Sequence, residues 1–322
     1  MNAVNRKGPR TNPSWKTRFW AVVKYELLWN IRKKKFLGML VVAFALATLS
    51  LVLTPILSNM IGEPLSQNPD YVVSSGASIG GLGLFLFAVV TVMNSISGEF
   101  ESGTIVPLLT KPVSRSMVFL GKLFAALITL LSAYAVLFIY ITIGGTIVYG
   151  PQNNLYLVPL ALLGSILSTF VWIAIVLAIG SISKSSLIAA LGAFGIFIAL
   201  FISAPIVSMF SDQARILTYV PGSGASGYIV GLGQQTTYTP GLSTSTGTDS
   251  IAVNLVNYVL HPSVKVSFFR IGGLNGQQIS WTPLYSEPLS LVLLRSLIVA
   301  ATYILAFLFI SWYAFKRAQV LE

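Results

Sequence analysis

The side chains able to do chemistry are few, and their spacing argues against an enzyme. Glu99 and Glu101 are the closest pair of carboxylates, but residues two apart on a helix point about 200° away from each other, so they do not form an acid/base pair. His261 is the only histidine and cysteine is absent, which leaves no imidazole and thiolate set for a metal. No Walker phosphate loop, H-E-x-x-H or G-x-S-x-G motif occurs. We expect a chain without catalytic residues, cofactor or metal.

The composition excludes both a water-soluble globule and a disordered chain. Of 322 residues, 55% are hydrophobic and 9% are charged, against about 25% charged residues in a typical soluble domain. This charge is too little to cover a soluble surface, and the hydrophobicity is too high for disorder. The elements that position Glu99 and Glu101 must therefore be helices in a bilayer.

Long uncharged segments predict six spanning helices. The first of these segments has 23 residues and a helical length of about 35 Å, enough to cross a hydrocarbon core of about 30 Å. We predict an all-α integral membrane protein with both termini on one side. Lys122 and Arg295 lie near span ends, where we expect them to snorkel to the interface. The predicted spans are Phe36–Ser58, Gly76–Ser97, Val118–Val148, Leu155–Ser181, Leu187–Phe210 and Leu291–Phe315.

The distribution of charge predicts the topology. Sixteen of the 20 Lys and Arg residues fall on the side of the termini, and ten of these precede the first span. The positive-inside rule places that side in the cytoplasm, so we expect a multi-pass protein of the plasma membrane with both termini cytoplasmic. A basic run beside a first span orients that span, so we expect no nucleic-acid partner. The chain divides into 1–35, a basic tail with an interfacial helix; 36–210, the first five spans; 211–290, an extracellular insertion; and 291–322, the sixth span and C-terminus.

The segment before the first span predicts a helix in the membrane interface. Asn12-Pro13-Ser14 is a plausible helix start. Tryptophan and lysine then alternate with apolar residues, a pattern that suits contact with membrane lipid. The amphipathic pattern is imperfect, because Glu26 and Asn30 fall on the same side as the apolar residues. The predicted interface residues are Trp15, Phe19 and Trp29.

The loop between the second and third spans, 98–117, predicts a docking element on the cytoplasmic face. Its acids, Glu99 and Glu101, precede Gly103 and an apolar turn, Ile105–Leu109. A short helix with charged ends and an apolar side suits a groove in another protein. An ordinary solvated loop is the alternative, but it would not need four apolar residues exposed together.

This loop resembles that of the type-2 permeases of ATP-binding-cassette exporters, and most closely the subgroup of bacitracin-resistance and copper-enzyme-maturation permeases. The family pattern is E-x-E-x-G-T, two apolar residues, P-V-S/T-R and then G-K, where Val113, Ser114, Gly121 and Lys122 also fit. Tyr25-Glu26-Leu27-Leu28 is similar to the family's entry helix. The positions to which the resemblance assigns ATPase coupling are Glu99, Glu101, Gly103, Thr104, Leu108, Leu109, Pro112 and Arg115.

The resemblance implies a permease subunit that performs no chemistry. Two such subunits, copies or paralogues, would pair, and separate ATP-binding-cassette ATPase subunits would drive export from below. Our hypothesis is that Glu99 and Glu101 pair with basic groups of the ATPase while Leu108 and Leu109 fill its groove. A channel or secondary transporter, and a lipid-handling membrane scaffold or enzyme, remain as alternatives.

Residues 211–290 depart from the family pattern, which usually has short re-entrant helices there. The stretch from Gln234 to Ser250 is typical of a flexible polar loop. We predict a short helix over Ile251–Leu260, ended by His261-Pro262, and an extended segment over Val264–Ile271. The insertion as a whole is interpreted as an outward cap or gate.

Overall fold

The computed structural model confirms the all-α membrane fold. It describes residues 14–32, 34–62, 67–74, 80–103, 113–210, 214–222, 226–230, 243–245, 247–272 and 280–318. Within these residues six helical segments are long and apolar enough to cross a membrane. The second segment is α4 followed by a turn and the short helix α5. The spans are α2 (Lys34–Ile61), α4 (Gly80–Val92) with α5 (Ser97–Glu101), α7 (Arg115–Tyr149), α8 (Val158–Ser183), α9 (Ser186–Phe210) and α11 (Leu289–Arg317).

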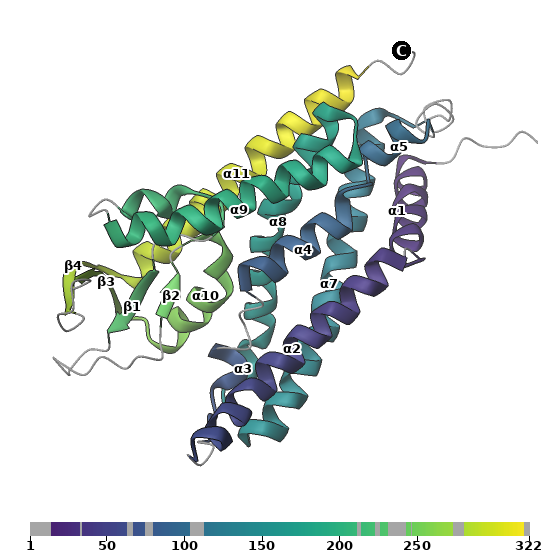
Figure 1. Ribbon diagram of the computed structural model, residues 1–322. Coiled ribbons are helices and arrows are strands. Elements are labelled where there is room, and N and C mark those ends of the chain that lie inside the picture. Colours follow the sequence, from purple (N-terminus) through teal and green to yellow (C-terminus); the bar gives the residue numbers. More distant parts are fainter. Residues whose placement is uncertain are drawn as a thin grey trace, which may run out of the picture.

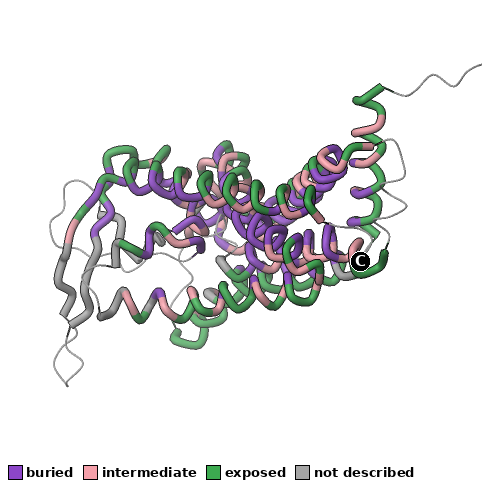
Figure 2. Tube along the Cα trace, turned by 90° about the horizontal axis from the view of Figure 1, so that it is seen from above, coloured by how far each residue is buried: buried purple, intermediate pink, exposed green. Residues whose placement is uncertain are grey.

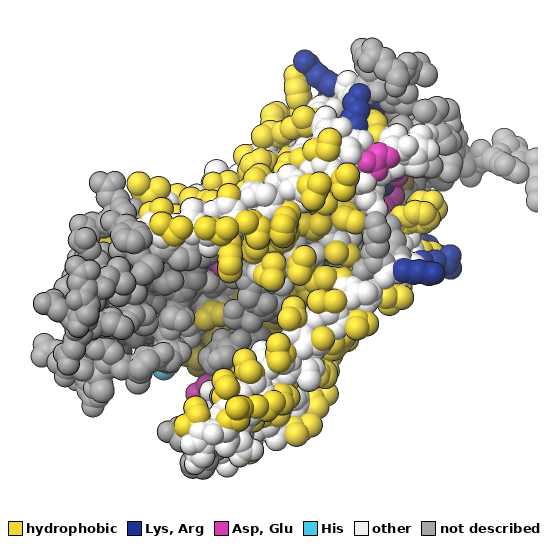
Figure 3. Space-filling model, viewed as in Figure 1, with side chains coloured by type: hydrophobic (Ala, Val, Ile, Leu, Met, Phe, Trp, Pro, Cys, Tyr) yellow, Lys and Arg dark blue, Asp and Glu magenta, His cyan; other side chains and the backbone are white. Residues whose placement is uncertain are grey.

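The two ends of the helix bundle differ in what they carry. Helix α1 (Trp15–Arg32), α5 and the end of α11 gather at one end, which we call the terminal end (Figure 1). At the opposite, distal end, α2 and α7 diverge from α9 and α11, and α3 (Tyr71–Ser74), α10 (Ile251–Leu260) and a β-sheet lie there. Figure 3 shows Lys and Arg at the terminal end and hydrophobic side chains along the spans.

Helix α8 forms the centre of the bundle because its small residues admit neighbours on several sides. A Cβ on Gly180 would lie 3.3 Å from Ala189 Cβ of α9 and 3.4 Å from Ser97 Oγ of α5. Polar side chains join α8 to other helices, as when the hydroxyls of Ser181 and Ser311 lie 2.7 Å apart. Such packing through small and hydroxyl residues is how helices associate in lipid. Buried residues accordingly follow the inner helices, while α2 and α9 are the least buried spans (Figure 2).

The distal end contains the only sheet among the described residues, and it belongs to the predicted insertion. The sheet is antiparallel with the order β2-β1-β3-β4, and α10 has the predicted bounds. The predicted extended segment is strand β3. Most of 234–250 lies outside the described residues. The remaining elements are η1 (Leu155–Leu157), η2 (Ala214–Tyr219), β1 (Ser226–Val230), β2 (Ser243–Ser245), η3 (Thr248–Ser250), β3 (Lys265–Gly272) and β4 (Ser280–Pro288).

Part of this insertion enters the bundle. The Tyr303 hydroxyl of α11 donates to the Tyr219 carbonyl over 3.2 Å, and a Cβ on Gly222 would lie 3.1 Å from the Trp172 ring of α8. Trp172 and Tyr303 each lie 14 residues into their helices, or about 21 Å from the distal helix ends. The segment from Tyr219 to Gly222 therefore reaches the middle of these two helices, where the Tyr303 hydroxyl satisfies one carbonyl of its irregular backbone.

The distal end also corrects the expectation for Arg295. The side chain does not snorkel to an interface: it is 9% exposed, forms an ion pair with Glu287 of β4, and donates to Thr218 Oγ1 over 3.3 Å. The reason is that the insertion folds back over α11 and supplies polar partners to the guanidinium.

Candidate functional site

The short helix α5 carries the two predicted carboxylates and lies at the terminal end. Its last turn is closed by Ser102, whose amide donates to the Gly98 carbonyl over 3.0 Å. The next residue, Gly103, has a φ of +66°, a left-handed conformation that costs a residue with a Cβ about 1 kcal/mol or more. Gly103 therefore lets the chain turn sharply away from α5.

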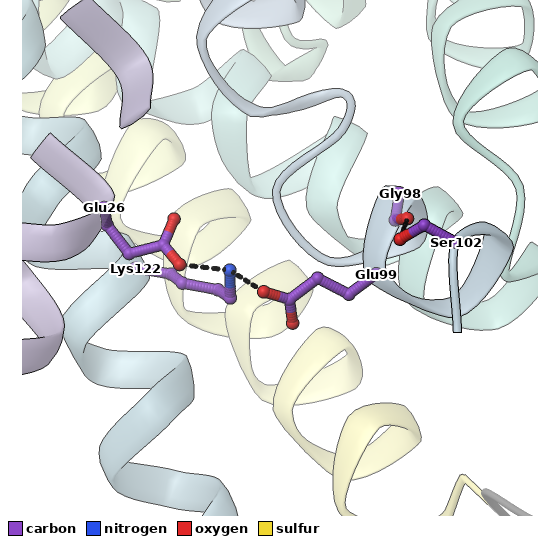
Figure 4. A network of polar contacts seen from close by, with 5 residues as sticks. All are labelled: Glu26, Gly98, Glu99, Ser102 and Lys122. Carbon is purple, nitrogen blue, oxygen red and sulfur yellow. Dashed lines mark hydrogen bonds and ion pairs between the residues drawn. The ribbon is translucent and has the colours of Figure 1, made fainter. Parts of the chain in front are cut away.

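Glu99 takes part in a buried ion-pair network with Lys122 and Glu26 (Figure 4). Lys122 Nζ of α7 lies 2.6 Å from Glu26 Oε1 of α1 and 2.7 Å from Glu99 Oε1 of α5. The Lys122 side chain is 4% exposed and that of Glu26 is 6% exposed. One ammonium thus joins three segments of the chain in a largely buried site, since the Glu99 side chain is 17% exposed, and loss of a single partner there is expensive.

Lys122 therefore corrects a second expectation, because it does not snorkel. The preceding residue explains how its partner reaches it. A Cβ on Gly121 would lie 2.7 Å from Val22 Cγ1 of α1, so only glycine lets α1 approach α7 this closely. The Gly-Lys pair noted in the sequence thus has a physical basis: Gly121 admits α1, and Lys122 binds the carboxylate that α1 presents.

Glu101 points to a different partner, as its spacing from Glu99 predicts. Its Oε1 accepts from the Ser186 amide over 2.7 Å and from Ser185 Oγ over 3.0 Å, and its Oε2 accepts from Ser186 Oγ over 2.5 Å. Ser186 is the first residue of α9. A carboxylate here satisfies a free helix amide and complements the positive end of the helix dipole.

Phe100, between the two acids, contacts the sixth span. Its ring meets that of Phe315 edge to face at 6.2 Å, and Phe315 also lies 6.3 Å from Phe119 of α7. Glu99 thus connects α5 to α7 and, through Lys122, to α1. Phe100 connects α5 to α11, and Glu101 connects it to α9. We call Glu99, Phe100 and Glu101, with these partners, the α5 hub.

Arg115, at the start of α7, ties the same end of the bundle to the end of α11. Its Nη1 donates to the carbonyls of Lys316 over 2.9 Å and Ala318 over 2.8 Å. A guanidinium at these carbonyls satisfies acceptors that have no partner inside the helix. The predicted residues of the second half of the loop, Thr104, Leu108, Leu109 and Pro112, lie outside the described residues.

The predicted interface residues divide between the two faces of α1. Trp15 and Trp29 are exposed. Phe19 is half-buried: it stacks on Trp15 at 5.4 Å and lies 6.0 Å from the Phe124 ring of α7. The face of α1 toward α7 also buries Val23, Glu26 and Asn30.

The sequence interpretation missed the roles of Glu26, Lys122 and Phe100. The signal for Glu26 was present, because it is the one acid on an otherwise apolar and basic helix and shares a face with Phe19 and Val22. A carboxylate on a face that packs must find a cation. Among the described residues, no group of three His, Asp or Glu residues could hold a metal.

The comparisons with known proteins agree with this architecture. The model of the family described as "ABC-2 family transporter protein" matches residues 20–320. This range includes α1 from Trp20, all six spans, the α5 hub and the distal insertion. A comparison with curated proteins gave no match. The chain, a membrane subunit with six spans, belongs to the ABC-2 family of transporter proteins.

Proposed function

We propose that the chain is the membrane subunit of an ATP-driven exporter of the plasma membrane, with both termini cytoplasmic. In this proposal it forms the substrate path with a second subunit, and separate ATPase subunits bind beneath the terminal end. ATP is hydrolysed only on those partners. The family match supports a transporter membrane subunit; the partner and the direction of transport are the parts that we propose.

The observation that carries the proposal is the α5 hub. A force applied to the loop after Gly103 acts on a helix whose last three residues contact α7, α11 and the start of α9. Lys122 of α7 connects this helix further to Glu26 of α1. Because α5 follows α4 after a short turn and its side chains contact α7, α9 and α11, such a force would act on four spans. Helices are stiff, so small displacements at this end become larger ones at the distal end.

The proposal gives different roles to the two halves of the loop. Glu99 and Glu101 have partners within the chain, so we assign them to transmission and not to ATPase contact. Leu108 and Leu109 are the residues that we assign to docking in an ATPase groove, with Thr104 and Pro112 shaping the segment that presents them. Arg115 holds the end of this segment against α11.

The two roles are separable by experiment. The tagged wild-type chain is purified from its native cells, and the ATPase that accompanies it is identified and co-expressed. The Leu108→Asp/Leu109→Asp variant should lose the ATPase, while the Leu108→Ile/Leu109→Ile control should keep it, with elution volume and melting temperature reporting that each chain is folded. Undiminished co-purification with the Asp variant contradicts docking by these residues.

The matched variant at the hub tests transmission. The Glu99→Gln/Glu101→Gln chain should still bind the ATPase, but binding should no longer stimulate hydrolysis to the wild-type level. Loss of the ATPase from this folded variant would instead make the hub a docking surface. Transport by the chain without any ATPase would favour a channel or secondary transporter.

A further inference from the structure

At the terminal end, the described acids have partners inside the chain, whereas most of the described cations are exposed to the surroundings. Each described acid at this end has a partner inside the chain: Glu26 and Glu99 bind Lys122, and Glu101 binds the first residues of α9. The cations, apart from Lys122 and the half-buried Arg18 and Arg115, are exposed. The exposed ones among the described residues are Lys16, Lys24, Arg32, Lys34, Lys184, Lys316 and Arg317.

Helix α1 has the highest density of these exposed cations, and its burial of Glu26 makes the exposed face purely basic. The same face carries large apolar side chains. Trp20, Lys24, Leu28 and Ile31 are all exposed, and at about 100° per residue they fall within a sector of about 80°. Tyr25, Trp29 and Trp15 are also exposed, but they continue around the helix from this sector, at about 140°, 180° and 220° from Trp20.

The connection to the first span fixes where this face lies. Helix α1 ends at Arg32 and α2 begins at Lys34, so α1 is tethered by a single residue to a helix that crosses the bilayer. The end of α1 at Trp29 is therefore held near the headgroup level, where Trp and Tyr are most favourable. The mixture of cations and exposed rings along the rest of the helix suits a headgroup layer better than an aqueous protein surface.

We propose that the exposed face of α1 binds anionic phospholipid headgroups of the adjacent leaflet. Lys16, Lys24, Arg32 and Lys34 attract the phosphates, and Trp20, Leu28 and Ile31 of the same face anchor the helix among the acyl chains. Lys122 contributes indirectly, because by neutralising Glu26 it removes the acid that would repel such lipids. The inference depends on the membrane-spanning fold and not on the proposed transport function.

Tryptophan quenching by brominated lipids tests this in the full-length chain. The chain is reconstituted in phosphatidylcholine vesicles that contain phosphatidylglycerol, with either lipid brominated, in a Trp281→Phe/Trp312→Phe background so that the exposed tryptophans are those of α1. Brominated phosphatidylglycerol should quench more strongly than brominated phosphatidylcholine at equal mole fraction. In the variant with Lys16→Gln, Lys24→Gln, Arg32→Gln and Lys34→Gln, we expect the preference for phosphatidylglycerol to fall by about fivefold or more.

The matched control removes cations of the same end from other helices, with Lys184→Gln, Lys316→Gln and Arg317→Gln, and should keep the wild-type preference. Equal quenching by the two lipids in the wild type, an unchanged preference in the α1 variant, or an equal loss in the control would each overturn the proposal. If the α1 variant fails to fold, a salt titration of the wild type replaces it. About 0.5 M NaCl should then abolish the preference by screening, and a preference insensitive to salt would overturn the proposal.

Discussion

Two cations are buried in the part of the chain that the structure describes, Lys122 at the terminal end and Arg295 at the distal end. They look equivalent in the sequence but differ in what they join. Lys122 binds carboxylates 96 and 23 residues away, so it holds together α1, α5 and α7. Arg295 binds Glu287, eight residues away, and so fixes the strand that leads directly into its own helix. The comparison teaches that Lys122 joins three helical segments of the bundle, across which we expect a movement to pass, whereas Arg295 joins two parts of the insertion, Glu287 and Thr218, to a single helix.

The largest expected effect comes from removing the Lys122 ammonium. In Lys122→Ala the buried carboxylate of Glu26 and the partly buried carboxylate of Glu99 lose their cation, and we expect a loss of about 3 kcal/mol. Thermal melting in detergent measures the loss, and hydrogen exchange should show faster exchange in α1, α5 and α7 together. Arg295→Ala, by contrast, should raise exchange only around β4, η2 and the start of α11.

Glu26→Gln and Glu99→Gln added to Lys122→Ala should recover part of the lost stability, because they remove the uncompensated charges. The control is an exposed substitution such as Lys16→Ala. If Lys122→Ala lowers the melting temperature no more than this control does, the ion-pair network does not hold α1, α5 and α7 together.

The second comparison is between glycines at helix contacts of the two ends. An added Cβ on Gly164 would lie 2.5 Å from Ala252 Cα of α10, whereas one on Gly121 would meet the Val22 side chain at 2.7 Å. Backbone yields less than a side chain, so we expect Gly164→Ala to cost about 3 kcal/mol and Gly121→Ala about 1 kcal/mol. Melting temperatures of the two variants decide the order, and the reverse order would mean that α1 is the more rigidly held element.

The smallest effect is expected at the cap of α9. Glu101→Ala removes the acceptor for the Ser186 amide, and loss of a helix cap costs about 1 kcal/mol. Glu101→Gln, which keeps an amide oxygen as an acceptor, should lose less. Hydrogen exchange of the first turn of α9 reports the difference. Identical exchange in the two variants would mean that the Glu101 side chain does not cap α9.

The spans and the local elements could be predicted from the sequence because their signals are local. The lengths of the uncharged segments predicted the six spanning segments. The order of apolar and turn-forming residues predicted α10 and β3 within the insertion. The second span differed in detail, since it divides into α4 and α5 around a turn at 93–95.

The partners of the buried charges could not be predicted in the same way. Lys122 and Arg295 lie close to span ends, where snorkelling is the ordinary outcome, and only the packing of α1 on α7 and of the insertion on α11 offers them carboxylates instead. The position of Tyr219 and Gly222 beside α11 and α8 likewise depends on contacts with Tyr303 and Trp172, which are distant in sequence.

The most direct test of transmission through the α5 hub uses the absence of cysteine in the chain. Spin labels are placed on Ile147→Cys of α7 and Ile206→Cys of α9, two exposed positions on helices that diverge toward the distal end (Figure 1). The distance between the labels is then measured in the complex with the ATPase, with and without ATP. We predict that ATP changes this distance in the wild type and in a Glu287→Gln control, and that the change is lost in a Glu99→Gln/Phe100→Ala/Glu101→Gln variant that still binds the ATPase. An undiminished change in that variant would contradict the account.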